Sequence, residues 1–347
     1  MVATVYGAAM SDLDALIDRG LQAVEDENIE AAKAALTEAQ ATAGENHVRV
    51  LHLRGLLAWA QEDLEQATKL LLEAADQGAG RPDIHFDAAE CLFTIEEVEE
   101  AEEQVRKVLE LSDVPSEQAD DARLLLAQLR LAVDDAAEAL EVLEGIDASR
   151  KSHPAYLGTL GAALLADEQF DTAVSTLKEA LSHDAEDSDI HYQLGIALLA
   201  VGQEADARKT MVRVLELDAK EWADLGEEMP PEPDFAETQE LRSRIEEVLE
   251  GLPDPVLKLV AAAPITVQAR ASAEQVQGGV DPRGTVVFLG SPKSDEDEAE
   301  LQGIVIMRDL VLSQVDDDDE IEEEMFYGLL EQIQYFFRRD DIIVAQA

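Results

Sequence analysis

The side chains that could ligate a metal or act as nucleophiles are few and unevenly placed. The chain has six histidines and one cysteine, Cys91, and all seven lie between His47 and His191. The neighbours Ser152-His153 and Ser182-His183 could in principle set a base beside a hydroxyl. Both pairs fall where we expect helix ends, and polar side chains at helix ends usually cap the backbone. The sequence therefore shows no distinct set of nucleophile and base.

Two stretches, one of glycines and one of acidic residues, could form a ligand-binding loop. Gly278-Gly279 is too short to cradle phosphates, and no Gly-Lys-Ser or Gly-Lys-Thr follows it. Asp316 to Glu324 is a nearly continuous acidic run that could bind calcium, but it lacks the glycine and the ligand spacing of an EF-hand. We interpret the run as a solvated loop that enters a helix, because a helix N-terminus favours negative charge. We expect no cofactor and no metal.

The composition bounds the class of protein. The chain has 347 residues, enough for two domains, with 46% apolar and 4% aromatic residues, which suits helices packed through alanine and leucine. Its 77 acidic and 26 basic residues give a formal charge of −51. Such a surface repels phosphate backbones, so we expect no nucleic-acid ligand; it favours basic partners or adaptation to a salty cytoplasm. One cysteine, no signal-peptide pattern and no long apolar run predict a cytoplasmic protein without membrane insertion.

A repeating frame of small residues organises the first two thirds of the chain. An alanine recurs at intervals of 35, 34, 38, 34 and 34 residues, at Ala32, Ala67, Ala101, Ala139, Ala173 and Ala207. Twelve residues before each alanine stands another small residue, at Gly20, Gly55, Ala89, Ala127, Gly161 and Gly195. Small residues at a helix crossing shorten the distance between the axes, so we expect the glycine to admit the alanine of its partner helix. A fixed period in the thirties predicts a helical solenoid.

Each period contains two helices. We expect the pairs at about residues 11–43, 47–76, 82–115, 116–146, 154–183 and 188–217. Pro82 and Pro154 stand where helices should begin, and proline is favoured in the first turn. Residues 11–218 are therefore predicted to form about six helical hairpins.

This layout resembles the tetratricopeptide repeat. The resemblance is strongest in the fifth and sixth periods, which carry Leu160-Gly161, Ala173, Leu177 and Ala180, and Leu194-Gly195, Ala207, Met211 and Val214. The first, third and fourth periods lack the large aromatic residue usual early in the first helix. The resemblance implies a right-handed superhelix whose first helices line a concave groove for a protein or peptide partner.

Carrying over the frame of that family assigns partner-binding positions to the groove. They are Arg49, His52, Leu56, Trp59, Asp83, Phe86, Glu90, Phe93, Leu124, Gln128, Leu131, Tyr192 and Leu199. The paired lysine and asparagine with which some members clamp a carboxylate are not found. An apolar and aromatic groove with an acidic surround suits a basic or amphipathic segment. The alternative is that Trp59, Phe86 and Phe93 are ordinary core or are covered by the C-terminal part of the chain.

A second domain follows a break in the pattern. Residues 219–235 contain the proline-rich acidic segment Glu227 to Pro233, which cannot continue a helix, and we expect a linker there. After a helix at about 236–250, apolar residues alternate near Ile265, Val286 and Ile304, which predicts three short strands. A final amphipathic helix is expected from about 322 to 338. The fold class is thus mainly α, a helical-hairpin solenoid followed by a small α+β domain over 236–347.

This second domain resembles the minimal zincin family of small zinc peptidases. The resemblance is carried by Gly279 to Arg283, by Phe288-Leu289-Gly290, by Arg308-Asp309-Leu310 and by the helix that includes Leu329 to Phe336. It implies zinc-ligand positions at Leu330 and Gln334, a general base at Glu331 and a third ligand at Asp340. Leucine cannot bind zinc and a glutamine amide binds it poorly, so the resemblance implies a degenerate domain that has kept the fold and lost the reaction.

Three functions follow as hypotheses. The first is a non-catalytic adaptor whose repeats bind a basic or amphipathic protein segment. The second is an acidic chaperone or nucleic-acid mimic that shields a basic protein, whose binding would weaken steeply with salt. The third is a zinc peptidase with a non-standard site, supported only by Glu331 and Asp340. We do not expect an enzyme.

Overall fold

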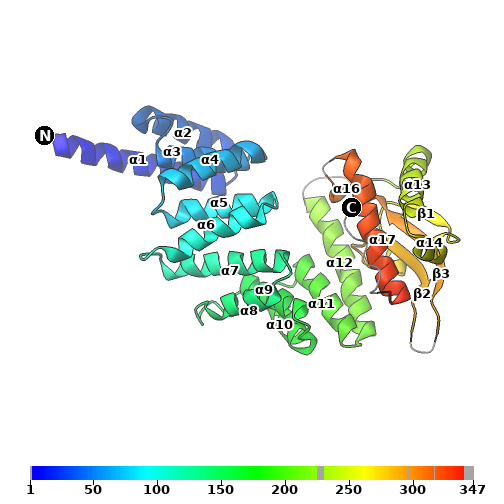
Figure 1. The fold of residues 1–347 in the computed structure, drawn as a ribbon. Coiled ribbons are helices and arrows are strands. Elements are labelled where there is room, and N and C mark those ends of the chain that lie inside the picture. Colours follow the sequence, from blue (N-terminus) through cyan, green and yellow to red (C-terminus); the bar gives the residue numbers. More distant parts are fainter. Residues whose placement is uncertain (1, 225–229, 295–296, 316, 340–347) are drawn as a thin grey trace. The chain divides into compact units, whose positions relative to one another are not determined.

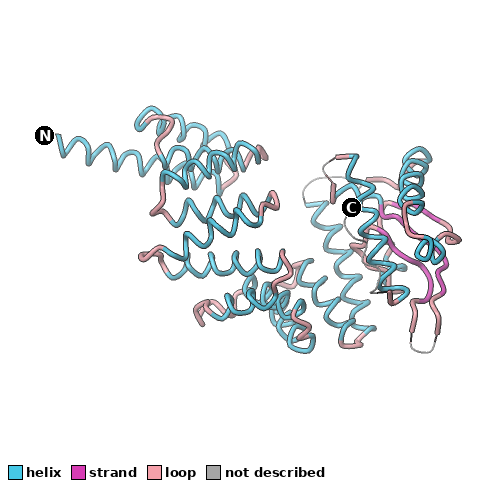
Figure 2. Tube along the Cα trace, viewed as in Figure 1, coloured by secondary structure: helices cyan, strands magenta, loops and turns pink. Residues whose placement is uncertain are grey.

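The chain divides into two compact units, residues 1–183 and 184–347. The computed structural model describes residues 2–224, 230–294, 297–315 and 317–339, and these are mainly helical (Figures 1 and 2). Asp340 lies outside the described residues. Each unit is considered on its own below.

The first unit consists of five helical hairpins that stack in sequence order (Figure 1). Its helices are α1 (Val2–Glu25), α2 (Ile29–Ala43), α3 (Val48–Trp59), α4 (Leu64–Gln77), α5 (Pro82–Thr94), α6 (Val98–Glu110), α7 (Ser116–Ala132), α8 (Ala136–Glu144), α9 (Pro154–Ala166) and α10 (Phe170–His183). Five of the predicted pairs are present. Helix α1 begins nine residues earlier than residue 11, where we expected the first pair to begin.

Glycines of the repeating frame sit against long side chains. A Cβ built on Gly161 would lie 2.3 Å from Leu177 Cδ2, and one built on Gly55 would lie 2.7 Å from Leu71 Cγ. The closest neighbour is therefore the residue sixteen positions on, not the alanine twelve positions on that we expected. Ala173 and Leu177 are one turn apart on the same face of α10, and the longer side chain reaches the glycine. Both are fully buried.

Every turn within a hairpin holds one residue in the left-handed backbone region. The φ angles run from 54° to 74° at Glu27, Glu62, Glu96, Asp134, Glu168 and Gly202. These positions follow the intervals of the alanine frame. In the second hairpin, the amide of Glu62 donates to Trp59 O (2.8 Å) and that of Asp63 to Ala58 O (3.0 Å), the pairing that ends a helix at a left-handed residue. Asp63 then caps α4 by accepting from the amide of Gln66.

Replacing Glu62 with glycine should stabilise the first unit by about 0.5–1 kcal/mol, because a left-handed conformation strains any residue with a Cβ. Urea unfolding monitored through Trp59 measures the change. Lys69→Gly, at an exposed position within α4, is the control and should destabilise by about 1 kcal/mol. A loss of stability in both variants would contradict the strain argument.

The second unit contains the sixth hairpin together with a small sheet. Its elements are α11 (Ser188–Ala200), α12 (Glu204–Asp224), α13 (Phe235–Glu250), α14 (Asp254–Val260), β1 (Ile265–Gln268), α15 (Ala273–Gln277), β2 (Val286–Ser291), β3 (Glu300–Met307), α16 (Arg308–Ser313), a 3-10 turn (Asp318–Glu320) and α17 (Ile321–Phe337). The three predicted strands form one sheet in the order β1-β3-β2. Strand β3 is parallel to β1 and antiparallel to β2.

Both faces of this sheet are covered at β2 and β3, where successive apolar residues are buried. On one face, Phe288, Ile304 and Ile306 pack with α13, α14 and α17. On the other face, Val287, Val305 and Met307 pack with Met211 and Val214 of α12. Successive residues of a strand point to opposite faces, so each face requires its own cover. The sixth hairpin supplies the second cover, which explains why it belongs to this unit.

The described part of the predicted linker also belongs to the second unit. Arg308, which is buried, donates to Pro231 O at 2.6 Å. The amide of Ala269 donates to Glu232 Oε2 at 3.0 Å. Residues 230–234 thus lie against the ends of β1 and β3, and Asp234 then caps α13.

Candidate functional site

The first helices of neighbouring hairpins lie side by side and form one layer of the first unit, with α1 next to α3, α3 next to α5, α5 next to α7, and α7 next to α9. This layer brings together most of the predicted partner-binding residues. We call them the odd-helix face: Arg49, His52, Leu56 and Trp59 on α3, Asp83, Phe86, Glu90 and Phe93 on α5, and Leu124, Gln128 and Leu131 on α7. All are partly buried except His52, which is buried.

Ion pairs join α3 to its neighbours on both sides. Arg49 lies 3.2 Å from Asp18 and 3.6 Å from Asp14 of α1. His52 Nε2 is 2.5 Å from Asp87 Oδ2 of α5. Arg49 and His52 of α3 thus contact carboxylates of the chain itself.

The negative charge of Asp83 is compensated within the chain. Burial alone would raise its pKa, but the hydrogen bond and charge of Arg81, with His52 and Arg49 nearby, hold the pKa below its ordinary value. Arg81 Nη2 donates to Asp83 Oδ2 at 2.8 Å. Asp83 is therefore ionised near neutral pH.

Glu90 is the exception on this face. Its pKa is raised to about 7 by burial and by the charges of Asp87 and Asp121. Both neighbours already have partners: Asp87 lies against His52 Nε2, and Asp121 pairs with Arg150 at 2.6 Å. Within the described residues, no basic side chain pairs with the carboxylate of Glu90. The odd-helix face is thus short of one positive charge at this point.

The apolar residues of the face contribute to the hairpin cores. Leu56 and Trp59 pack against the core between α3, α4 and α5. Phe86 and Phe93 pack against the next core, which involves α5, α6 and α7. Each also keeps part of its surface exposed. The ordinary-core alternative thus holds for the inward part of these side chains.

Tyr192 and Leu199 lie on α11, which belongs to the second unit, whereas the odd-helix face belongs to the first. The Tyr192 hydroxyl donates to Asp281 at 2.9 Å, and the Arg283 guanidinium lies 5.1 Å from the centre of its ring. Burial and the Asp281 charge raise the pKa of Tyr192 well above its ordinary value. The side chain is held by its own unit, while Leu199 is 48% exposed.

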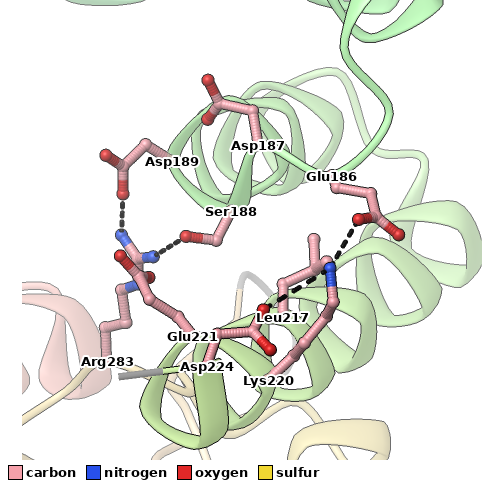
Figure 3. A pocket seen from close by; sticks show the side chains of 9 residues that line it. All are labelled: Glu186, Asp187, Ser188, Asp189, Leu217, Lys220, Glu221, Asp224 and Arg283. Atoms are coloured by element: carbon pink, nitrogen blue, oxygen red, sulfur yellow. Dashed lines mark hydrogen bonds and ion pairs between the residues drawn. The ribbon is translucent and has the colours of Figure 1, made fainter. Parts of the chain in front are cut away.

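Arg283 is the centre of a polar cluster at the open end of the sixth hairpin. It donates to Asp218 (2.8 and 3.2 Å), to Asp189 (2.7 Å) and to Ser188 (2.9 Å). Figure 3 shows its guanidinium pointing toward Asp189 and Ser188. Arg283 lines a hollow of about 580 Å³. The hollow is also lined by Glu186, Asp187, Leu217, Lys220, Glu221 and Asp224, and Lys220 pairs with Glu186 and Asp224 across it (Figure 3).

Helix α17 carries three of the four positions assigned by the zincin resemblance. Leu330 is partly buried against the core between α17 and the sheet. Glu331 lies at the surface of α17. Partial desolvation of its carboxylate, together with the charges of Asp281 and Glu324, raises its pKa. Gln334 is partly buried. In the part of the chain that the structure describes, no three His, Cys, Asp or Glu side chains are grouped to hold a metal ion.

Comparison with known families identifies the repeats. The sequence model of the tetratricopeptide repeat matches residues 58–118 and 164–227. These two stretches carry tetratricopeptide repeats. A search of the curated proteins gave no match. None of the described helices combines the length and the apolar content needed to cross a bilayer.

Part of the chain is similar to solved structures, and the similarity to one of them, PilF, shows a shared fold. PilF of Pseudomonas aeruginosa superposes with a TM-score of 0.53 at 16% identity, over 60% of this chain and 93% of that one. MamA of Desulfovibrio magneticus RS-1 gives a TM-score of 0.43 at 21% identity, over 50% of this chain and 96% of that one. YrrB, described as a repeat protein with an unusual peptide-binding site, gives 0.42 at 16% identity, over 53% and 92%.

Sequence reasoning missed a recurrent arginine-binding position. Asp14, Asp83, Asp121 and Asp189 occupy the same place in their repeats, since their spacings of 69, 38 and 68 are sums of the repeat intervals. Each forms an ion pair with one arginine, respectively Arg49, Arg81, Arg150 and Arg283. Aligning aspartates as well as alanines to the frame would have found the acidic half of each pair. Arg49, Arg81 and Arg150 come from different frame positions and Arg283 lies outside the repeats, so the arginines give no such signal.

Proposed function

We propose that this protein is a non-catalytic interaction scaffold whose odd-helix face binds a basic or amphipathic segment of a protein partner. The observation that carries the proposal is the position of Glu90, which is partly buried beside Asp87 and Asp121 without a cation of its own. A lysine or arginine of a partner would supply the missing charge. The exposed parts of Trp59, Phe86 and Phe93 on the same face would contact the apolar side of an amphipathic segment.

The C-terminal domain is proposed to be a degenerate minimal-zincin-like domain that has no peptidase activity. Leu330 stands at a ligand position of that family and packs against apolar neighbours. All six histidines lie at or before His191, so no imidazole is available from residues 192–347. A carboxylate and an amide without imidazole are a poor set for zinc. Purified protein should therefore contain no stoichiometric zinc, and chelator-sensitive cleavage of peptides would contradict this part of the proposal.

The pH dependence of binding tests the proposed site. The probe is a fluorescent amphipathic peptide of leucine, alanine and arginine, which has no side chain that titrates between pH 6 and 8. Glu90, with its pKa of about 7, is mostly protonated at pH 6 and mostly ionised at pH 8. A bound cation favours the ionised form, so affinity should rise with pH and be about tenfold higher at pH 8 than at pH 6. Glu90→Gln should remove most of this rise and weaken binding at pH 8 by about tenfold.

The matched control is Glu99→Gln, an exposed glutamate on α6, whose affinity and pH profile should equal those of the unmodified protein. An equal loss of affinity in both variants would mean that the peptide responds only to the net charge of the protein. Together with complete loss of binding at 0.5 M salt, that outcome would replace the groove account with that of an acidic chaperone or nucleic-acid mimic.

A further inference from the structure

Helix α17 presents a stripe of alternating acidic and aromatic side chains to solvent. Glu323, Tyr327, Glu331 and Tyr335 are spaced four residues apart, so they lie one above another on one face of the helix. Both glutamates are exposed. Tyr327 is 47% exposed and Tyr335 is 70% exposed, which is high for tyrosines on a helix that packs against a sheet. We call these four residues the α17 stripe.

The stripe is separate from the face that packs α17 in place. Leu329, Ile333 and Phe336 are buried against the sheet and α13. Gly328 allows α17 to lie close to Thr285, the residue that precedes β2, because a Cβ on Gly328 would lie 2.4 Å from Thr285 Oγ1. The fold of α17 therefore does not require tyrosine at 327 or 335. The Tyr327 hydroxyl donates to Glu323 at 3.3 Å, a contact within the stripe itself.

The stripe lacks positive charge. Within the described residues, neither Glu323 nor Glu331 forms an ion pair with a lysine or arginine. Asp281 and Glu324 are close enough to Glu331 for their charges to raise its pKa. Like charges gathered around one carboxylate disfavour its ionised form, and a bound cation would reverse this.

The same unit shows how this combination of groups holds an arginine. The guanidinium of Arg283 lies over the ring of Tyr192 and donates to the carboxylates of Asp189 and Asp218 (Figure 3 shows the bond to Asp189). A planar guanidinium can stack on an aromatic ring and pair with a carboxylate at once, whereas an ammonium offers only a point charge. The α17 stripe contains the same two kinds of group, a tyrosine ring and a carboxylate, but no arginine.

From this geometry we infer that the α17 stripe is a second docking surface, separate from the odd-helix face, for a helix of a partner protein that carries arginines one turn apart. The four-residue spacing of the stripe matches the spacing of such arginines, since residues four apart project from the same side of both helices. The charge of the stripe and that of the partner are complementary. The inference rests on the proposed scaffold function, and the protein would then bind basic segments at one site in each unit.

The inference is tested with the full chain and a helical peptide that carries arginine at every fourth position among alanines. Calorimetry at 0.15 M salt should give two sites per chain, one on each unit. Tyr327→Ala with Tyr335→Ala should weaken one of the two sites by about five- to tenfold, and Glu331→Lys should abolish it, because like charges then face each other. Replacing the arginines of the peptide by lysine should weaken this site by about threefold or more.

Two control variants distinguish docking on the α17 stripe from a general effect of net charge and from binding at the odd-helix face. Glu247→Lys, at an exposed position of α13, changes the net charge by the same amount and should leave both sites within about twofold, because salt screens distant charges. Glu90→Lys should abolish the other site and leave the stripe unaffected. The inference is wrong if Glu331→Lys and Glu247→Lys weaken binding equally, or if the tyrosine variants retain both sites. Self-association of the chain that disappears in the tyrosine variants would also overturn it, since the occupant would be a second copy.

Discussion

Replacing Gly161 with leucine is expected to lower the free energy of unfolding of the first unit by about 1–2 kcal/mol. A Cβ at this position already meets Leu177 Cδ2 at 2.3 Å, and Leu177 is fully buried. The new side chain would force α9 and α10 apart. Overpacking of this kind typically costs about 1–3 kcal/mol or more, which outweighs the roughly 1 kcal/mol that leucine gains over glycine in helix propensity.

Urea unfolding of a Trp222→Phe background, in which Trp59 alone reports on the first unit, measures this effect. Hydrogen exchange should show the greatest loss of protection in α9 and α10. The control is Ala155→Leu, at an exposed position on the same helix, which should stay within about 0.5 kcal/mol of the background. If Gly161→Leu proved as harmless as the control, close packing at the glycine would not be what sets the repeat frame.

Removal of the Arg283 side chain is expected to destabilise the second unit by about 2–3 kcal/mol. Arg283→Ala would leave the carboxylates of Asp218 and Asp189 without their partner and the ring of Tyr192 without its cation. Breaking a buried pair costs about 3–5 kcal/mol, and the partial exposure of these groups reduces that figure. Arg283→Lys should recover less than half of the loss, because lysine cannot make the paired bonds to Asp218.

A Trp59→Phe background allows the second unit to be followed through Trp222, which lies beneath the guanidinium of Arg270. Arg242→Ala serves as the control, since its ion pair with Glu246 is exposed and such pairs contribute about 0.5 kcal/mol or less. An Arg283→Ala variant that matched this control would show that the cluster in Figure 3 does not hold the sixth hairpin to the small domain.

The repeats could be predicted because their signals are local. The interval between Gly161 and Ala173, and its return 34 residues later, depends only on how two adjacent helices pack. Helix starts at Pro82 and Pro154 were predicted for the same reason, and both are confirmed. The left-handed turn residues were not predicted, because five of the six are acidic residues that rarely adopt this conformation.

The joining of the sixth hairpin to the sheet could not be predicted in the same way. It depends on contacts such as that between Tyr192 and Asp281, which are 89 residues apart and have no local signature. One signal was available in β3. Ile304, Val305, Ile306 and Met307 are apolar without alternation, which indicates a strand covered on both faces and therefore a second layer of helices. The sequence could show that such a layer is needed but not that α12 provides it.

Glu90 shows the corresponding limit for the candidate site. Its frame position placed it on the odd-helix face, but its unusual charge state depends on Asp87 and Asp121, which come from its own helix and the next hairpin. Only the arrangement of α5 beside α7 brings these carboxylates together. The frame thus predicted the helix face on which Glu90 lies, and the structure adds the two neighbouring carboxylates that raise its pKa.

The most direct test of the scaffold function is hydrogen exchange of the full chain with and without the leucine-, alanine- and arginine-containing peptide. The account predicts that the peptide slows exchange in α3, α5 and α7, that α4, α6 and α8 are unaffected, and that Glu90→Gln reduces the protection at pH 8. Protection of the even-numbered helices, or no protection of α5 at saturating peptide, would contradict the account.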